Sequence, residues 1–234
     1  MEKRLSTGKC HFCNGTFSRE EMTQHFKSCE PRKALLRKLA DKPGSRKTGV
    51  YHLFVEGRYQ TAYWMHLEIH SDAILHELDR FLRDIWLECC GHLSAFTIEK
   101  KSYLFQQFEK PFFVWGPQPE EYDMDIELEK VLRPRIKFYY EYDFGTPTEL
   151  ALRVVSYYER RGRGKQIQLL ARNDPPLIFC AVCGKKRAIL ICTQCQWSGK
   201  GWLCESCAPN HECDEEMFLP VVNSPRTGQC GYAG

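Results

Sequence analysis

Residues 180–213 read CAVCGKKRAILICTQCQWSGKGWLCESCAPNHEC, and the rest of the chain is interpreted around this stretch. Three Cys-x-x-Cys pairs follow one another at intervals of eight residues, and a His-x-Cys pair ends the run. Seven cysteines and one histidine supply two sets of four ligands, which is the number that zinc takes in a structural tetrahedral site. A two-residue gap lets both thiolates of a pair point at one ion. The stretch therefore predicts two zinc sites.

The order of these ligands predicts an interleaved arrangement. We expect the first pair to share an ion with the third pair, and the second pair to share one with the His-x-Cys pair. The first site would hold Cys180, Cys183, Cys204 and Cys207, and the second would hold Cys192, Cys195, His211 and Cys213. Pairing of neighbouring motifs is an alternative that the spacing leaves open. The order of ligands resembles cross-brace zinc modules of the ZZ, B-box and MYND type.

A further cysteine and histidine motif lies near the N-terminus. Cys10 and Cys13 precede His25 by a gap of eleven residues, and Cys29 follows after three more. This spacing is close to that of a ββα zinc finger with cysteine as the last ligand. Because His25 and Cys29 are four residues apart, one helix would present both on the same face. We predict a third zinc ion here.

The residues around these ligands agree with a finger. Phe17 and Met22 stand where such fingers place core side chains. Ser18 and Glu21 have the capping-box spacing, so a helix is expected to begin there and to continue to about Ala40. A single finger spans only about three base pairs, which makes it a structural or protein-contact module unless other contacts help it.

Composition and location bear on the metal. The chain has 234 residues, a net charge of +3 and 13 cysteines. Its first ten residues are charged and lack an apolar signal segment, and no apolar run approaches the length of a membrane span. Because disulfide frameworks belong to secreted chains, we expect a cytoplasmic, reduced protein with zinc at these sites. Cys89, Cys90 and Cys230 would remain free thiols, with Cys89 and Cys90 buried at a helix end.

Two segments concentrate positive charge. Residues 1–50 carry a net charge of +7 and residues 151–200 carry +8, whereas residues 51–150 carry −8. Such segments are either solvated faces or contacts for nucleic acid, made mainly to phosphates and with weak sequence preference. The candidate nucleic-acid-binding residues are Arg32, Lys33, Arg37, Lys38, Arg46, Lys47, Arg160, Arg161, Arg163 and Lys165.

The middle of the chain predicts an α+β domain with a small antiparallel sheet and one main amphipathic helix. The helix is the apolar stripe of residues 74–89, which ends before Gly91. Strands are expected at 50–55, 59–70, 93–98, 102–108 and 136–144. A last pair of strands, 150–158 and 166–171, would pair with each other across the basic turn 160–165.

This order of elements resembles the Ri-plasmid Orf-three-like family, also called TnpR-like transposon passenger proteins. The matching pieces include residues 51–69, the helix at 71–88, the run 91–96 and Tyr140 to Gly145. The resemblance covers roughly residues 48–175 and implies an α+β fold. His92 and Asp143 match polar positions of the family and form a possible polar site. After Gly145 this chain departs from the family's acidic, Trp and His residues, so that site would be partial.

The sequence thus predicts five segments. They are a finger at 1–30, a basic helix and linker at 31–47, the α+β domain at 48–175, a two-zinc module at 176–215 and a tail at 216–234. The function predicted is that of a non-enzymatic protein with three zinc ions that binds nucleic acid or has a regulatory role in a mobile element or its host. The alternatives are a protein adaptor that acts through the C-terminal module, and an enzyme with a pocket at His92 and Asp143.

Overall fold

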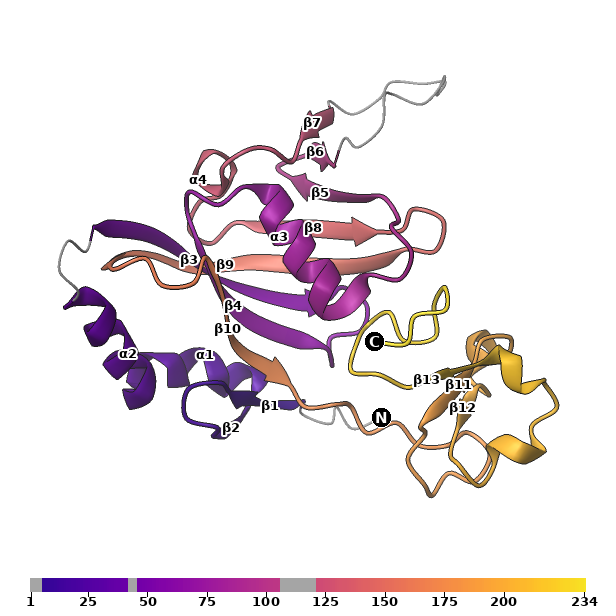
Figure 1. Cartoon of the computed structure of the whole chain (residues 1–234). Coiled ribbons are helices and arrows are strands. Elements are labelled where there is room, and N and C mark those ends of the chain that lie inside the picture. Colours follow the sequence, from indigo (N-terminus) through magenta and orange to yellow (C-terminus); the bar gives the residue numbers. More distant parts are fainter. Residues whose placement is uncertain (1–5, 42–45, 106–120) are drawn as a thin grey trace.

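One ten-stranded sheet forms the body of the protein, as a computed structural model of residues 6–41, 46–105 and 121–234 shows (Figure 1). Among the described residues, neighbouring strands of this sheet run antiparallel, except for β6 and β7, which run parallel. In spatial order the strands are β2 (Thr16–Ser18), β1 (Thr7–Cys10), β10 (Ile167–Asn173), β4 (Trp64–His70), β3 (Lys47–Gly57), β9 (Thr148–Arg161), β8 (Lys137–Tyr142), β5 (Ser94–Ile98), β6 (Lys101–Leu104) and β7 (Glu121–Asp123). The fold is mixed α/β with a large antiparallel-rich sheet, so the prediction of a small sheet is wrong.

The predicted pairing of the last two central strands is also wrong. β9 pairs with β3 and β8, whereas β10 pairs with β4 and β1. The β3–β4 hairpin therefore lies between β9 and β10. The basic turn at 160–165 connects two strands that are separated in the sheet by β3 and β4. The alternation of Leu150, Leu152 and Val154 identifies a buried face of β9 but carries no information about its neighbour.

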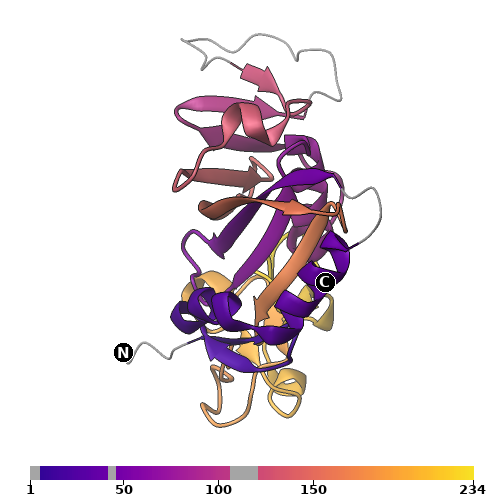
Figure 2. The same cartoon turned by 90° about the vertical axis from the view of Figure 1, so that its left-hand side faces the viewer.

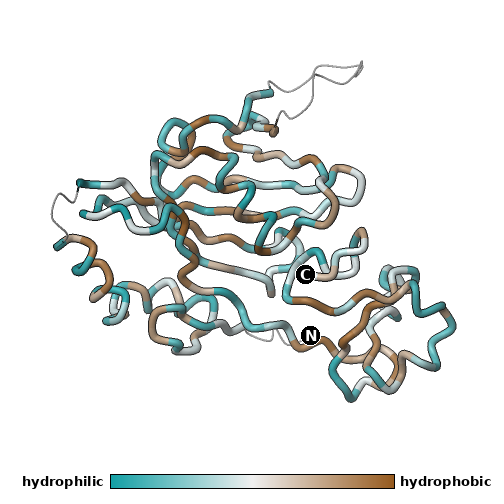
Figure 3. Tube along the Cα trace, in the orientation of Figure 1, coloured by the Kyte–Doolittle hydropathy of each residue, from teal (hydrophilic) through white to brown (hydrophobic). Residues whose placement is uncertain are grey.

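The central strands are buried on both faces. Leu53 and Leu67 belong to a large core beneath α3 (Leu75–Leu82), whereas Phe54 and Trp64 point to the opposite face and pack with Met22 of α1 (Arg19–Ser28). Hydrophobic residues accordingly follow the central strands (Figure 3). The finger is thus a covering layer of the sheet, and its hairpin extends the sheet by two strands.

The helices differ from the single main helix that the sequence predicted. The amphipathic stretch forms α3 and a π-helical turn, η1 (Arg83–Leu87), and a short helix α4 spans Leu128–Val131. The predicted capping box of α1 is confirmed, since Ser18 Oγ accepts a hydrogen bond from Glu21 N and the Glu21 carboxylate accepts one from Ser18 N.

A second helix follows α1 where one continuous helix was expected. The helix breaks at Cys29, whose backbone is extended, and α2 (Glu30–Ala40) begins after it. Pro31, in the first turn of α2, has no N–H to continue the hydrogen bonding of α1, which explains the break. α1 and α2 lie on the near side in Figure 2. The linker at 43–45 lies outside the described residues.

The C-terminal module has a sheet of its own, in the order β12 (Trp202–Leu203), β11 (Leu190–Cys192), β13 (Phe218–Pro220). Three 3-10 turns complete it, namely η2 (Gln196–Ser198), η3 (Ala208–Asn210) and η4 (Glu215–Met217). Residues 221–234 then return to the central sheet (Figure 1). Within the described ranges, no helix has the length and apolar character needed to cross a bilayer.

Candidate metal centres and basic surface

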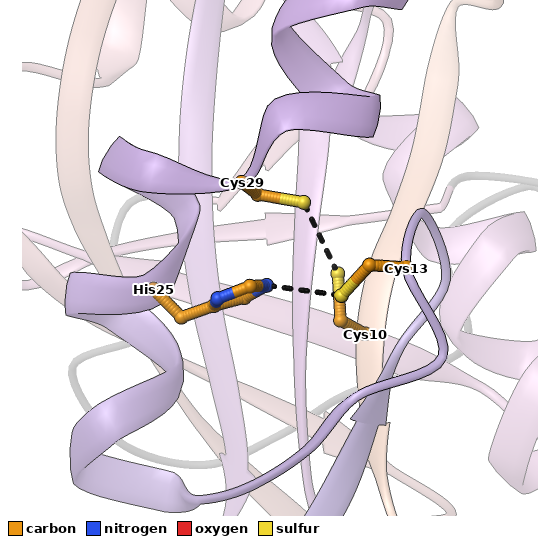
Figure 4. A group of neighbouring side chains, drawn as sticks. All are labelled: Cys10, Cys13, His25 and Cys29. Atoms are coloured by element: carbon orange, nitrogen blue, oxygen red, sulfur yellow. Dashed lines mark hydrogen bonds between the residues drawn. The ribbon is translucent and has the colours of Figure 1, made fainter.

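The finger cluster is assembled from the first hairpin and the first helix (Figure 4). β1 and the turn after it carry Cys10 and Cys13, and α1 and its C-cap carry His25 and Cys29. Cys10 Sγ lies 3.9 Å from Cys29 Sγ, and Cys13 Sγ lies 3.3 Å from His25 Nε2. The imidazole is held by stacking on Phe17, with ring centroids 3.9 Å apart. The four predicted ligands therefore face one point.

The two clusters of the C-terminal module have the interleaved arrangement. Cys183 Sγ lies 3.9 Å from Cys204 Sγ, and Cys195 Sγ lies 3.6 Å from Cys213 Sγ. The first and third pairs meet because Ala181 N donates to Trp202 O, which brings the knuckle at 180–183 beside β12. In each cluster, all four ligand atoms lie within 4.8 Å of one another, and the groups are Cys180, Cys183, Cys204 and Cys207, and Cys192, Cys195, His211 and Cys213.

The sulfur separations match metal ligation better than disulfide formation. A disulfide needs its sulfurs about 2.05 Å apart. Four sulfurs placed about 2.3 Å from a central zinc ion would instead lie about 3.8 Å from one another. The observed separations of 3.6–3.9 Å agree with that tetrahedron, and all thirteen cysteines are free. These clusters could hold metal ions, and the identity of zinc stays a prediction.

Thiol acidity is uneven within the cluster of Cys180, Cys183, Cys204 and Cys207. Burial raises the pKa of Cys180, but hydrogen bonds from the backbone of Cys183 and Cys204 outweigh it and lower that pKa to about 6. The pKa of Cys207 is raised to about 12, chiefly by its hydrogen bond with Cys204. Adjacent thiols thus share negative charge unevenly when no cation compensates them. A divalent cation would stabilise all four thiolates together.

A fourth cluster was missed by the sequence analysis. Cys89, Cys90, His92 and Cys230 also place their ligand atoms within 4.8 Å of one another. Cys90 is exposed and Cys89 half-buried, so the expected burial of this pair is wrong. The local signal was the run Cys-Cys-x-His, which supplies three ligands, but the fourth comes 140 residues after Cys90. No local spacing could have identified Cys230.

The predicted polar pair lies beside this fourth cluster. His92 Nε2 is 3.5 Å from Asp143 Oδ2, so the two side chains do meet. Asp143 already binds the buried Arg226, whose Nη2 donates to Oδ2 at 2.7 Å. Burial raises the pKa of Asp143, but this hydrogen bond and those from the backbone of Thr146 and Gly145 outweigh it and lower the pKa. Asp143 is therefore an anion held by structural contacts, which weakens the expectation of a catalytic pair.

The two basic segments meet on one side of the molecule. β3 and β9 pair at their ends, where Lys47 lies opposite Arg161, and Gly162 N donates to Arg46 O. α2 lies against this region, since a Cβ at Gly162 would stand 2.3 Å from Leu39 O. Hollows of about 730 and 560 Å³ open beside α2 and the basic turn. Segments about 120 residues apart in the sequence thus form one surface.

The ten predicted basic residues fall into three groups. Arg32 of α2 and Arg160 of β9 both bind the buried Glu68 of β4, a role that the sequence did not predict. Lys33, Lys47 and Arg163 form ion pairs with exposed acidic residues at 2.8–3.1 Å. The remaining five are exposed, namely Arg37, Lys38, Arg46, Arg161 and Lys165.

Comparison with known proteins does not assign this chain to a family. No family model matches the chain, and no curated protein matches it. A solved structure similar to part of it is that of a protein of unknown function from Methanosarcina mazei Go1, at 15% identity and a TM-score of 0.43. The similarity covers 53% of this chain and 68% of that one. At these values it carries no argument, so the family resemblance stays a prediction.

Proposed function

We propose that this is a non-enzymatic, nucleic-acid-binding protein whose fold is held by structural zinc. Zinc would occupy the finger cluster and both clusters of the C-terminal module, which makes three ions. Four cysteine or histidine ligands fill the coordination sphere of zinc and leave no position for a reactive water. These ions would therefore organise the fold and carry out no hydrolysis. A reducing location such as the cytoplasm suits thiolate ligands.

One observation supports a polyanionic ligand, namely the convergence of the two basic segments beside α2 and the β9–β10 turn. Arg46, Arg161 and Lys165 are exposed there, and no aromatic side chain interleaves them in the sequence. Such a surface suits phosphate contacts, which give weak sequence preference and a strong dependence on salt. The resemblance to the Orf-three-like family extends the proposal to a nucleic-acid-associated role in a mobile element or its host.

Salt-dependent binding tests the proposal. We expect the full chain to bind duplex DNA at low salt and to lose affinity steeply as salt rises. Alanine at Lys38, Arg46, Arg161 and Lys165 should reduce the slope of log K against log salt, by up to about one unit for each lost phosphate contact. Arg32 and Arg160 stay unchanged, because their loss would leave the buried Glu68 carboxylate without an ion-pair partner. The control removes four other exposed charges, at Lys100, Lys101, Lys130 and Lys137, and should leave the slope as it was. Equal slopes in both variants would refute the proposal.

A second candidate function is protein binding by the C-terminal module. Five of the eleven large hydrophobic side chains exposed among the described residues lie there, namely Leu177, Phe179, Val182, Ile189 and Trp197. Trp197 is 76% exposed, and tryptophan is enriched among the residues that carry most of the binding energy at protein interfaces. Serine at Trp197 and Val182 should weaken capture of a protein partner and leave DNA binding unchanged. Serine at Tyr59, equally exposed on the central domain, serves as the control.

A further inference from the structure

We propose that Cys89, Cys90, His92 and Cys230 form a fourth zinc site, and that the ion in it fastens the C-terminal segment to the central domain. The site is independent of the nucleic-acid proposal. The cluster of Cys180, Cys183, Cys204 and Cys207 has four cysteines, and each of the other three clusters has three. Together they account for all thirteen cysteines in the chain. Every cysteine would then be a metal ligand.

The separations of the ligand atoms repeat those of the three predicted clusters. Cys90 Sγ lies 3.7 Å from both Cys89 Sγ and Cys230 Sγ, close to the tetrahedral value of about 3.8 Å. His92 Nε2 lies 3.0 Å from Cys90 Sγ and 3.1 Å from Cys230 Sγ. The corresponding distance in the finger, from His25 Nε2 to Cys13 Sγ, is 3.3 Å. A bound ion would need to move the His92 ring by only a few tenths of an ångström.

The backbone is shaped to bring these ligands together. Cys230 has a φ of 45°, in the left-handed region that disfavours a residue with a Cβ. Gly91 has a φ of 76° and open space around it, so its glycine is required by conformation and not by crowding. That turn lets Cys90 and His92 face the same point. An unfavourable conformation at Cys230 is consistent with a ligand that binding holds in place.

Neighbouring groups complement three thiolates around one ion. Three thiolates and a neutral imidazole leave a net charge of −1 with a divalent cation. Arg226 Nη2 donates to Cys89 Sγ at 3.5 Å and also to Asp143 Oδ2. The Tyr142 hydroxyl lies 3.9 Å from the same sulfur. Such contacts behind the ligands orient them and balance their charge.

Closing this site would have a mechanical consequence. The chain leaves the central domain after β10, builds the C-terminal module and returns in residues 221–234. Ser224 Oγ donates to Trp86 O at 2.6 Å, which docks the returning segment, and the metal would lock its end. The module is then tethered at both its entry and its exit. Because Cys90 and Cys230 are exposed, this ion should be the first that a chelator removes.

The first test counts ions and reactive thiols in the full chain. Protein supplied with excess zinc and then desalted is analysed by native mass spectrometry and by alkylation with peptide mapping. We expect four zinc ions and thirteen protected cysteines. Three ions with rapid alkylation of Cys89, Cys90 and Cys230 would overturn the proposal. A disulfide among these three, seen as the loss of two hydrogens, would overturn it equally.

A pair of variants separates metal binding from docking. Cys230→Ser should lower the count from four ions to three and make Cys89 and Cys90 reactive. Ser224→Ala removes the hydrogen bond to Trp86 and loosens the same segment, yet it should keep four ions. Hydrogen exchange at 224–232 should quicken in both variants. Four ions in Cys230→Ser would refute the site. Chelator titration of the unmodified chain, in which Cys89, Cys90 and Cys230 should become reactive before any other cysteine, gives a check that needs no variant.

Discussion

The finger and the C-terminal module use similar ligand clusters in different structural settings. In the finger, β1 pairs with β10 and extends the large sheet, and Met22 and Phe26 share a core with Trp64. The C-terminal module has its own three-stranded sheet and a small core around Leu203. A metal site can therefore support either the whole fold or one local unit, depending on where its backbone pairs.

The largest expected difference comes from removing one ligand in each setting. Cys10→Ser should lose an ion and lower the unfolding free energy of the whole sheet by about 4 kcal/mol or more, because structural zinc binding is folding energy. Hydrogen exchange in β4 should rise with it. Cys195→Ser should also lose one ion, but should expose only residues within 180–220. The core that Met22 and Phe26 share with Trp64 ties the finger to the centre of the sheet, and among the described residues the C-terminal module has no such shared core.

The matched outcomes decide between two models of the finger. If Cys10→Ser exposes residues 7–28 and leaves β4 protected, the finger is an independent unit and the shared core contributes little. If Cys195→Ser exposes β4, the C-terminal module is integral to the sheet as well. Metal content measured on each variant confirms that a single ion was lost.

Local spacing explains what the sequence could predict. The Cys-x-x-Cys pairs, the Ser18–Glu21 capping box and the apolar stripe of α3 each depend on residues within a few turns of one another. Partners distant in sequence were not predictable, because β9 presents the same alternation to either neighbour. Cys230 and Arg226 belong to a segment with no periodic pattern, and their partners lie on other elements. The contacts of Glu68 with Arg32 and Arg160 likewise join residues that are far apart in the sequence.

Residues 221–234 connect the C-terminal module back to the central sheet. Arg226 is fully buried and donates to Asp143 and Thr148. Arg226→Met would leave the buried Asp143 without its arginine partner, at a cost of about 3 kcal/mol. Hydrogen exchange should show residues 221–234 released while β3 and β4 stay protected. The control is Arg187→Met, at an exposed arginine of the module. It should change neither the stability nor the hydrogen exchange of residues 221–234. A fall in the stability of the whole sheet would mean that the segment is part of the central core.

Acid should act on the face of the sheet that the finger covers. His52 Nε2 and His66 Nδ1 lie 2.9 Å apart beneath Phe26, and burial lowers the pKa of His52 to about 4. The unfolded chain takes up protons near pH 6.5, where the folded chain does not. Stability should therefore be full above pH 6.5 and fall by about 2 kcal/mol towards pH 5. Unfolding at saturating zinc, compared with His52→Gln, measures this slope. An equal slope in the variant would show that His52 does not cause the acid sensitivity.

The smallest expected effect tests whether the stability of α1 affects the stability of the whole sheet. Ser18 caps α1 through the hydrogen bond from Glu21 N, and Ser18→Ala should cost about 1 kcal/mol. Because α1 packs on Phe54 and Trp64, that loss should lower the melting temperature of the sheet by roughly 2–4 °C. Thr193→Val removes a comparable hydrogen bond, from Thr193 Oγ1 to Met217 O, within the C-terminal module. It should leave the melting of the sheet unchanged and speed hydrogen exchange only near β11 and β13. Equal shifts in both variants would show that the two ends are coupled to the sheet to the same degree.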